Sequence, residues 1–112
     1  SLVLEGAELV CVCANWEAPH QDEWYTYLKA RAYENAVFVA AANRVGQEYS
    51  YTFLGHSAIV GPRGELLSVV DEPIEGYAIA KIDLDDVRKA REESQLLQNR
   101  QPLTYRAIVK KY

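Results

Sequence analysis

Two short apolar runs, separated by one helical stretch, constrain the fold of this chain more than any other feature. Residues 8–14 read ELVCVCA and residues 37–42 read VFVAAA. Runs of this length that are rich in Val and poor in polar residues are typical of strands buried on both faces. A sheet of such strands needs a covering layer on each side, so the sequence predicts a layered α/β protein.

The stretch between the two runs, residues 19–35, is predicted to be a helix. Apolar and polar side chains recur in it at the spacing of one helical face. The residues at this spacing are Trp24, Leu28, Arg31 and Asn35. Arg31 shares its stripe with two apolar residues, so we expect it to point inward and to be paired with Glu34, three residues on.

The rest of the chain predicts further short elements in one continuous domain. These are an exposed Tyr-rich loop at 47–54, strands at 57–60, 66–70 and 77–82, a charged helix at about 84–95 and a tail at 96–112. The predicted order is therefore β-α-β-β-β-α-tail. One long and one short helix do not cover both faces of such a sheet, so we expect a missing half or a partner subunit to complete it.

Length and charge exclude several classes of protein. The chain has 112 residues and a net charge of −4. It therefore lacks the excess of basic residues that would indicate binding to nucleic acid or to an anionic membrane. No apolar run approaches the ~18 residues that a membrane span requires. The first residue is Ser1 rather than Met, which suggests a fragment, and two cysteines without further partners suit a reducing cytoplasm.

The nucleophilic side chains do not form a complete catalytic group. Cys11 and Cys13 lie inside an apolar run and are expected to be core thiols. A metal site built from these cysteines with His20 and His56 stays an alternative, although the spacing matches no usual zinc pattern. Ser57 lies between Gly55 and Ile59, where a nucleophile elbow needs a second Gly and a following helix.

A small set of motifs, in order, is more informative than any single residue. The motifs are Gly6-Ala7-Glu8-Leu9, Asn15-Trp16, Trp24, Arg31-Ala32-Tyr33-Glu34-Asn35, Asn43-Arg44-Val45-Gly46, Phe53-Leu54-Gly55-His56-Ser57, Gly61-Pro62-Arg63-Gly64-Glu65, Asp83-Leu84-Asp85, Arg100-Gln101-Pro102 and Tyr105. Together they resemble the C-terminal part of the carbon–nitrogen hydrolase (nitrilase) superfamily. The Asn-Trp and Asn-Arg-Val-Gly pieces are more similar to its amidase branches than to true nitrilases.

The resemblance implies a fold and a chemistry. The family fold is an α-β-β-α four-layer sandwich, an α+β sandwich whose members are usually dimers or larger oligomers. Its members hydrolyse non-peptide carbon–nitrogen bonds through a Cys thioester, with a Glu and a Lys, and need no cofactor or metal. All three catalytic residues precede the segment that matches Gly6, so residues 1–112 are expected to be the C-terminal portion of one such domain, inactive when isolated.

The resemblance also implies site residues. Asn15 and Trp16 follow the first strand, at the strand end where sheets of this kind bind ligands. The expected substrate pocket therefore includes Ala14, Asn15 and Trp16, with Phe53 and His56 at its rim. The expected structural supports are Arg31, Glu34, Asn43 and Arg44. Two residues depart from the family pattern: Glu17, where Pro is common, and Gln101, where a second Arg is common.

Two functions from different classes remain open on the sequence. The first is a part of a cytoplasmic, homo-oligomeric carbon–nitrogen hydrolase that acts on a small amide or nitrile. The second is a non-catalytic interaction module that associates with a complementary half or a homologous subunit. The residues do not distinguish amide, nitrile and carbamoyl-amine substrates.

Overall fold

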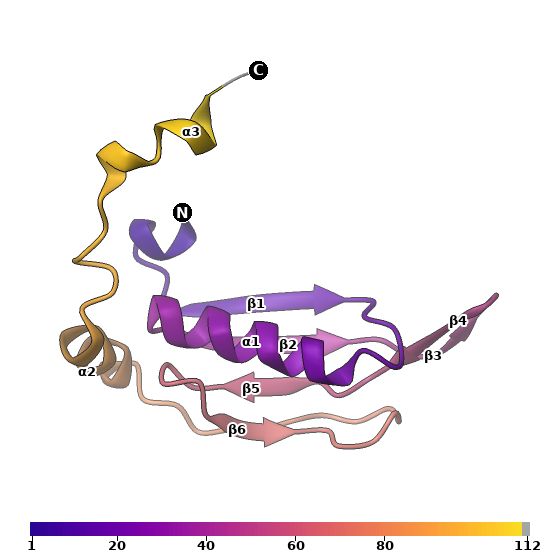
Figure 1. The fold of residues 1–112 in the computed structure, drawn as a ribbon. Helices are drawn as coiled ribbons and strands as arrows, with labels where there is room; N and C mark the ends of the chain where they lie inside the picture. The colour runs from indigo at the N-terminus through magenta and orange to yellow at the C-terminus, as the bar shows by residue number, and fades with distance from the viewer. Residues whose placement is uncertain (111–112) are drawn as a thin grey trace.

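The computed structural model describes residues 1–110; the last two residues of the predicted tail, 111–112, lie outside this range. The chain forms four main strands, two main helices and several short elements (Figure 1). In order they are η1 (Leu2–Glu5), β1 (Leu9–Ala14), α1 (Gln21–Asn35), β2 (Phe38–Asn43), β3 (Val45–Glu48), β4 (Tyr51–Leu54), β5 (Ala58–Val60), β6 (Leu66–Val69), α2 (Asp85–Ser94), η2 (Pro102–Thr104) and α3 (Arg106–Val109).

The main sheet has the strand order β1-β2-β5-β6. Strands β1 and β2 are parallel, in a register that runs from Leu9 opposite Phe38 to Ala14 opposite Asn43. Helix α1 is the crossover that parallel neighbours require. Strand β5 pairs antiparallel with β2, and β6 pairs antiparallel with β5. The turn at 61–64 connects β5 to β6. The predicted α/β fold class is confirmed, and the arrangement agrees with one helix-covered sheet of the expected sandwich.

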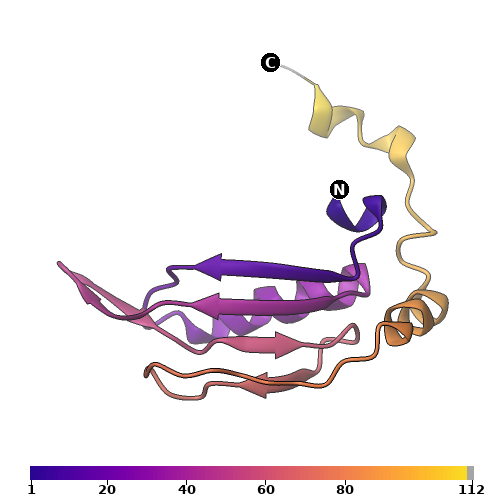
Figure 2. The same ribbon diagram turned by 180° about the vertical axis from the view of Figure 1, so that it is seen from behind.

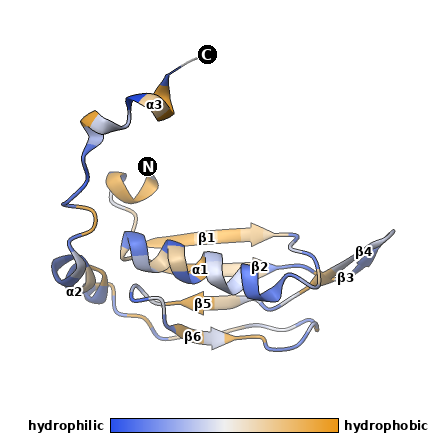
Figure 3. Cartoon of the chain, viewed as in Figure 1, coloured by the Kyte–Doolittle hydropathy of each residue, from blue (hydrophilic) through white to orange (hydrophobic). Residues whose placement is uncertain are grey.

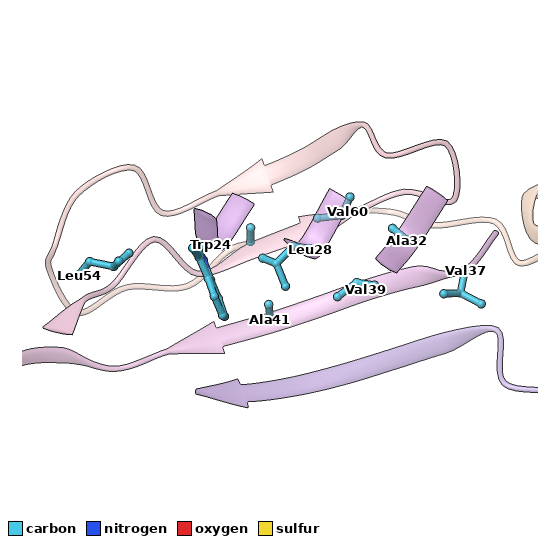
Figure 4. Close-up of a cluster of buried hydrophobic side chains, with 9 residues drawn as sticks. Trp24, Leu28, Ala32, Val37, Val39, Ala41, Leu54 and Val60 are labelled. Atoms are coloured by element: carbon cyan, nitrogen blue, oxygen red, sulfur yellow. The ribbon is translucent and has the colours of Figure 1, made fainter. Parts of the chain in front are cut away.

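The core lies between α1 and one face of this sheet (Figure 4). Trp24, Leu28 and Ala32 on the helix are at most 5% exposed, and they meet Val39 and Val60 from the strands. The buried stripe therefore advances in steps of four residues and passes through Ala32, not Arg31. The expectation that Arg31 points inward is wrong: its side chain is 69% exposed, and it forms a surface ion pair with Glu34.

The opposite face of the sheet carries no helix within residues 1–110 (Figure 2). Exposure therefore alternates along β1, and Cys11 and Cys13 are exposed free thiols rather than core residues. Burial on both faces is not found for β1, whereas β2 begins with Phe38 and Val39, which are each only 2% exposed. The apolar residues on this face include Leu9, which is 42% exposed, and Ala42, which is also exposed.

Two further predictions about local structure are wrong. Residues 47–54 belong to a projecting hairpin, β3–β4, rather than a loop (Figure 1). Its turn is made by residues 49–50, with Tyr49 at a φ of 53° and almost fully exposed. Residues 77–82 form no strand, since they have no ladder partner among the described residues.

Helix α2 and the β3–β4 hairpin lie at opposite ends of the sheet (Figure 1). The Arg91 guanidinium donates a hydrogen bond of 2.8 Å to the carbonyl of Ala7, just before β1. A two-bond ion pair links Arg63, in the β5–β6 turn, to Glu93. Figure 3 shows that α2 is mostly hydrophilic whereas β1 is hydrophobic. None of the helices formed by residues 1–110 is long and apolar enough to cross a membrane.

Candidate functional site

An open depression of about 450 Å³ lies at the carboxyl ends of the parallel strands β1 and β2. Its walls come from the last residues of both strands and the residues that follow them. They are Cys13, Ala14, Asn15, Ala42, Asn43 and Arg44. Because ligands bind preferentially off the carboxyl ends of strands in such sheets, this depression is the candidate site. Four of the predicted residues, Ala14, Asn15, Asn43 and Arg44, meet here.

The Asn43 side chain occupies the centre of a hydrogen-bond network below this depression. It is 8% exposed. Its Oδ1 accepts a bond of 2.7 Å from the Trp16 N–H. Its Nδ2 donates to the carbonyls of Trp16 and Gly55, at 3.1 and 2.8 Å. One amide therefore connects the segment after β1, the end of β2 and the segment before β5.

Trp16 is half-buried, and its ring turns toward helix α1. The ring centroid lies 5.8 Å from those of both Trp24 and Tyr27. The indole Nε1 donates a bond of 2.8 Å to the carbonyl of His20, at the start of α1. Asn15, in contrast, is exposed and lines the depression. The two residues of the predicted Asn-Trp motif thus point to different layers.

Phe53 and His56, the residues predicted for the rim, are both buried and line no part of the depression. The Arg44 guanidinium carbon lies 4.5 Å from the centroid of the Phe53 ring, and Arg44 also pairs with Glu48. The His56 Nδ1 lies 3.2 Å from the Tyr25 hydroxyl. Phe53 therefore packs beneath a residue that lines the depression, whereas His56 contacts helix α1.

Tyr25 is a residue that the sequence analysis missed. Burial raises the pKa of its phenol, and the nearby Asp71 carboxylate raises it further. Its ring lies edge-on to His56. Tyr25 is adjacent to the apolar stripe of α1 rather than on it, so the periodicity of the helix gave no signal for this contact.

A second hollow, a groove of about 690 Å³, lies on the α1 side of the sheet. It runs between η1, β1 and α1, and most of its lining is apolar. The residues that line it include Leu2, Val3, Val10, Val12, Tyr27 and Leu28. Its polar lining includes Ser1, Arg31 and Asn35, and of the residues predicted for the pocket only Trp16 lines it.

The remaining candidates for a nucleophile or a metal ligand are Ser57, Cys11 and Cys13, and none of them belongs to a catalytic or metal-binding group among the described residues. The Ser57 hydroxyl accepts a bond of 3.0 Å from the Asn43 N–H and lies 3.4 Å from the Asn43 carbonyl. In the part of the chain that the structure describes, no carboxylate or imidazole is hydrogen-bonded to this hydroxyl. Cys11 and Cys13 lie on the open sheet face, and across residues 1–110 no group of three His, Cys, Asp or Glu side chains is placed to hold a metal ion.

Comparison with known proteins decides the family. A family model described as carbon-nitrogen hydrolase matches residues 1–92. This chain belongs to the carbon–nitrogen hydrolase family. It is 40% identical over 107 residues to a probable nitrilase of Schizosaccharomyces pombe, a match that covers 95% of this chain and 39% of the relative. It is also 40% identical over 88 residues to the 2-oxoglutaramate amidase of Bacillus subtilis, covering 79% of this chain and 34% of that enzyme.

Solved structures of the family share the fold of this carbon–nitrogen hydrolase chain. A carbon-nitrogen hydrolase from Helicobacter pylori superposes with a TM-score of 0.86 at 27% identity, over 98% of this chain and 43% of that one. An amidase from Nesterenkonia sp. AN1, with a covalent acetamide adduct at its active-site cysteine, superposes with a TM-score of 0.74 at 28% identity, over 94% of this chain and 36% of that one. The chain thus spans about 40% of the length of these relatives.

Proposed function

We propose that residues 1–112 form the C-terminal part of an amidase-type carbon–nitrogen hydrolase that acts on a small amide or nitrile. The observation that carries the proposal is the depression at the carboxyl ends of β1 and β2, whose lining includes the exposed Cys13 and Ala42. The relatives include nitrilases and amidases and are more than twice as long as this chain. We assign the nucleophilic Cys, the Glu and the Lys to a preceding segment.

The reaction we propose is a two-step acyl transfer. The Glu takes the proton of the Cys thiol as sulfur attacks the amide carbon, and the Lys ammonium stabilises the oxyanion. The C–N bond breaks, the nitrogen takes the proton from Glu, and ammonia or an amine leaves the thioester. A water molecule, deprotonated by Glu, then attacks the thioester carbon, which releases the carboxylic acid and restores the thiol.

The residues of this chain shape the pocket in that scheme. Ala14 and Asn15 form the wall at the end of β1, and Trp16, which follows them, turns its ring toward helix α1. Phe53 supports the wall through Arg44, whereas His56 contacts Tyr25 on helix α1, outside the lining of the depression. In this scheme none of these residues acts as nucleophile or base, and no cofactor takes part.

The uncovered sheet face supports the same proposal. Exposed apolar residues and two thiols there match the interior surface of a layered protein rather than its outside. We propose that a second sheet covers this face and that the complete protein is a cytoplasmic homodimer or larger oligomer. The same face favours the alternative function, a non-catalytic module that binds a complementary half.

Trapping of the thioester tests the proposal directly. The intact protein is incubated with fluoroacetamide and digested, and the adduct is located by mass spectrometry. We expect a single adduct on a cysteine outside residues 1–112, together with loss of amide hydrolysis. The matched control is Cys11→Ser, a position outside the lining of the depression, and this variant should react and hydrolyse like the wild type. An adduct on Cys11 or Cys13 would refute the assignment, and a protein without adduct or activity would favour the interaction module.

A further inference from the structure

The hydrogen bonds around Trp16 show an exchange of strand partners at the candidate site. In the parallel ladder, Phe38 donates to the carbonyl of Glu8, and Arg44 donates to that of Ala14. The regular pattern would continue with the Trp16 N–H donating to the Arg44 carbonyl. That carbonyl instead accepts a bond of 2.9 Å from Gly55.

Trp16 therefore leaves β2 and joins β4. Its carbonyl accepts a bond of 3.2 Å from the Leu54 N–H, and two residues later Ala18 donates to Thr52 at 2.8 Å. Glu17 forms an isolated bridge with Phe53. At the point of exchange the Trp16 N–H has no backbone acceptor, and the Asn43 Oδ1 takes this role at 2.7 Å.

We propose that Asn43 is a positioning residue for the substrate pocket, because its side chain fixes the direction in which the chain leaves β1. This inference rests on the proposed function, since the segment that it fixes carries Asn15 and Trp16. A partly buried N–H without an acceptor is costly, so the exit segment without Asn43 would rearrange to satisfy the Trp16 amide. The wall of the depression would move with it. The nucleophile, in another segment, would keep its place.

Hydrogen exchange and kinetics of the intact protein together test this role. In Asn43→Ala we expect the Trp16 amide to exchange about tenfold faster or more, while amides of β6 keep their protection. We expect KM to rise about fivefold or more, with a smaller change in kcat, because the wall moves and the nucleophile does not. Ser57→Ala is the local control: it removes a bond to the Asn43 backbone but none to Trp16, so the Trp16 amide should exchange as in the wild type.

Three results would overturn the proposal: an unchanged Trp16 amide in Asn43→Ala, a uniform rise in exchange across the chain, or an unchanged KM. If the Ala variant does not fold, Asn43→Asp replaces it. The Asp side chain keeps the acceptor for the Trp16 N–H but loses the donors to Trp16 and Gly55. The Trp16 amide should then stay protected as in the wild type, and faster exchange of this amide would overturn the proposal. If the intact protein hydrolyses no amide or nitrile, the proposed function is wrong. The exchange rate of the Trp16 amide in Asn43→Ala still tests separately whether Asn43 positions this segment.

Discussion

The indole Nε1 of Trp24 donates a hydrogen bond of 2.9 Å to the carbonyl of His56, and both residues are buried. This bond joins the first half of α1 to the segment before β5, where His56 has a φ of 55°. The helix layer and the sheet are therefore connected by a polar contact inside an apolar core. Such contacts are sensitive to the loss of either partner.

Replacement of Trp24 by Phe tests this contact. The variant leaves the His56 carbonyl without its donor, so we expect the free energy of unfolding to fall by about 1–3 kcal/mol. Urea denaturation of the intact protein measures the change. The matched control is Trp16→Phe, whose lost bond to the His20 carbonyl is exposed to water and should cost less. Equal losses in the two variants would contradict the interpretation.

Gly55 is predicted to tolerate no side chain. Its φ is +68°, and a Cβ atom would lie 2.8 Å from Cγ1 of Val45 and 3.3 Å from the Cα of Pro73. We expect Gly55→Ala to lower the free energy of unfolding by about 2–4 kcal/mol, from backbone strain and overpacking together. Gly46→Ala is the control, because Gly46 has a φ of +95° but nothing within 4 Å of the added Cβ. Thermal unfolding should show the smaller loss at Gly46.

The ion pair between Arg63 and Glu93 should make the attachment of α2 depend on pH. The hydrogen bonds from Arg63 hold the pKa of Glu93 below its ordinary value of 4.5. A carboxylate with a lowered pKa stabilises the fold above its unfolded pKa, and this contribution is lost as the pH falls through the folded pKa. We therefore expect the stability difference between wild type and Glu93→Gln to be present at pH 7 and to disappear in acid below pH 4.5. Because the pair is exposed, added salt should also reduce the difference.

Alkylation of Cys11 and Cys13 tests whether another layer covers the open sheet face. Both thiols are exposed in this chain. In the intact protein we expect iodoacetamide to modify them at least about tenfold more slowly than a cysteine in a short peptide, because a covering sheet excludes the reagent. Modification in urea gives the control for full reactivity. Peptide-like rates in the native protein would mean that the face is bare.

The sequence predicted the layered core because its signals are local. The apolar runs at 8–14 and 37–42 and the helix that follows Pro19 are all observed close to their expected bounds. The prediction that Arg31 points inward was wrong because a helical stripe can continue after Leu28 at the third residue, Arg31, or at the fourth, Ala32. Ala32, one position on, is small enough to bury at 0% exposure against the sheet.

Other errors follow from partners that local patterns do not reveal. The apolar character of β1 predicted two covered faces, whereas residues 1–110 leave the face that carries Cys11 open, so Cys11 is exposed. The hairpin β3–β4 is built from strands of only four residues, and β3 (VGQE) has no apolar alternation that marks it as a strand. Residues 77–82 alternate like a strand but have no neighbour to pair with among residues 1–110.

The candidate site was predicted in part, for a similar reason. Ala14, Asn15, Asn43 and Arg44 converge because two parallel strands end at one edge, which the order of the motifs indicates. The buried Phe53 contacts Arg44 and the buried His56 contacts Tyr25, next to the segment where Trp16 exchanges strand partners. No spacing in the sequence encodes that exchange.

Helix α2 offers an attachment point for reporter groups. It contacts the chain at Ala7, before β1, whereas the depression begins at Cys13. The six residues of β1 span about 20 Å, so the contact with α2 and the depression lie at opposite ends of this strand. A fluorophore at an exposed position of α2 such as Glu92 would be far enough from Asn15 to leave the pocket wall undisturbed. Binding assays and surface immobilisation could therefore share one labelled protein.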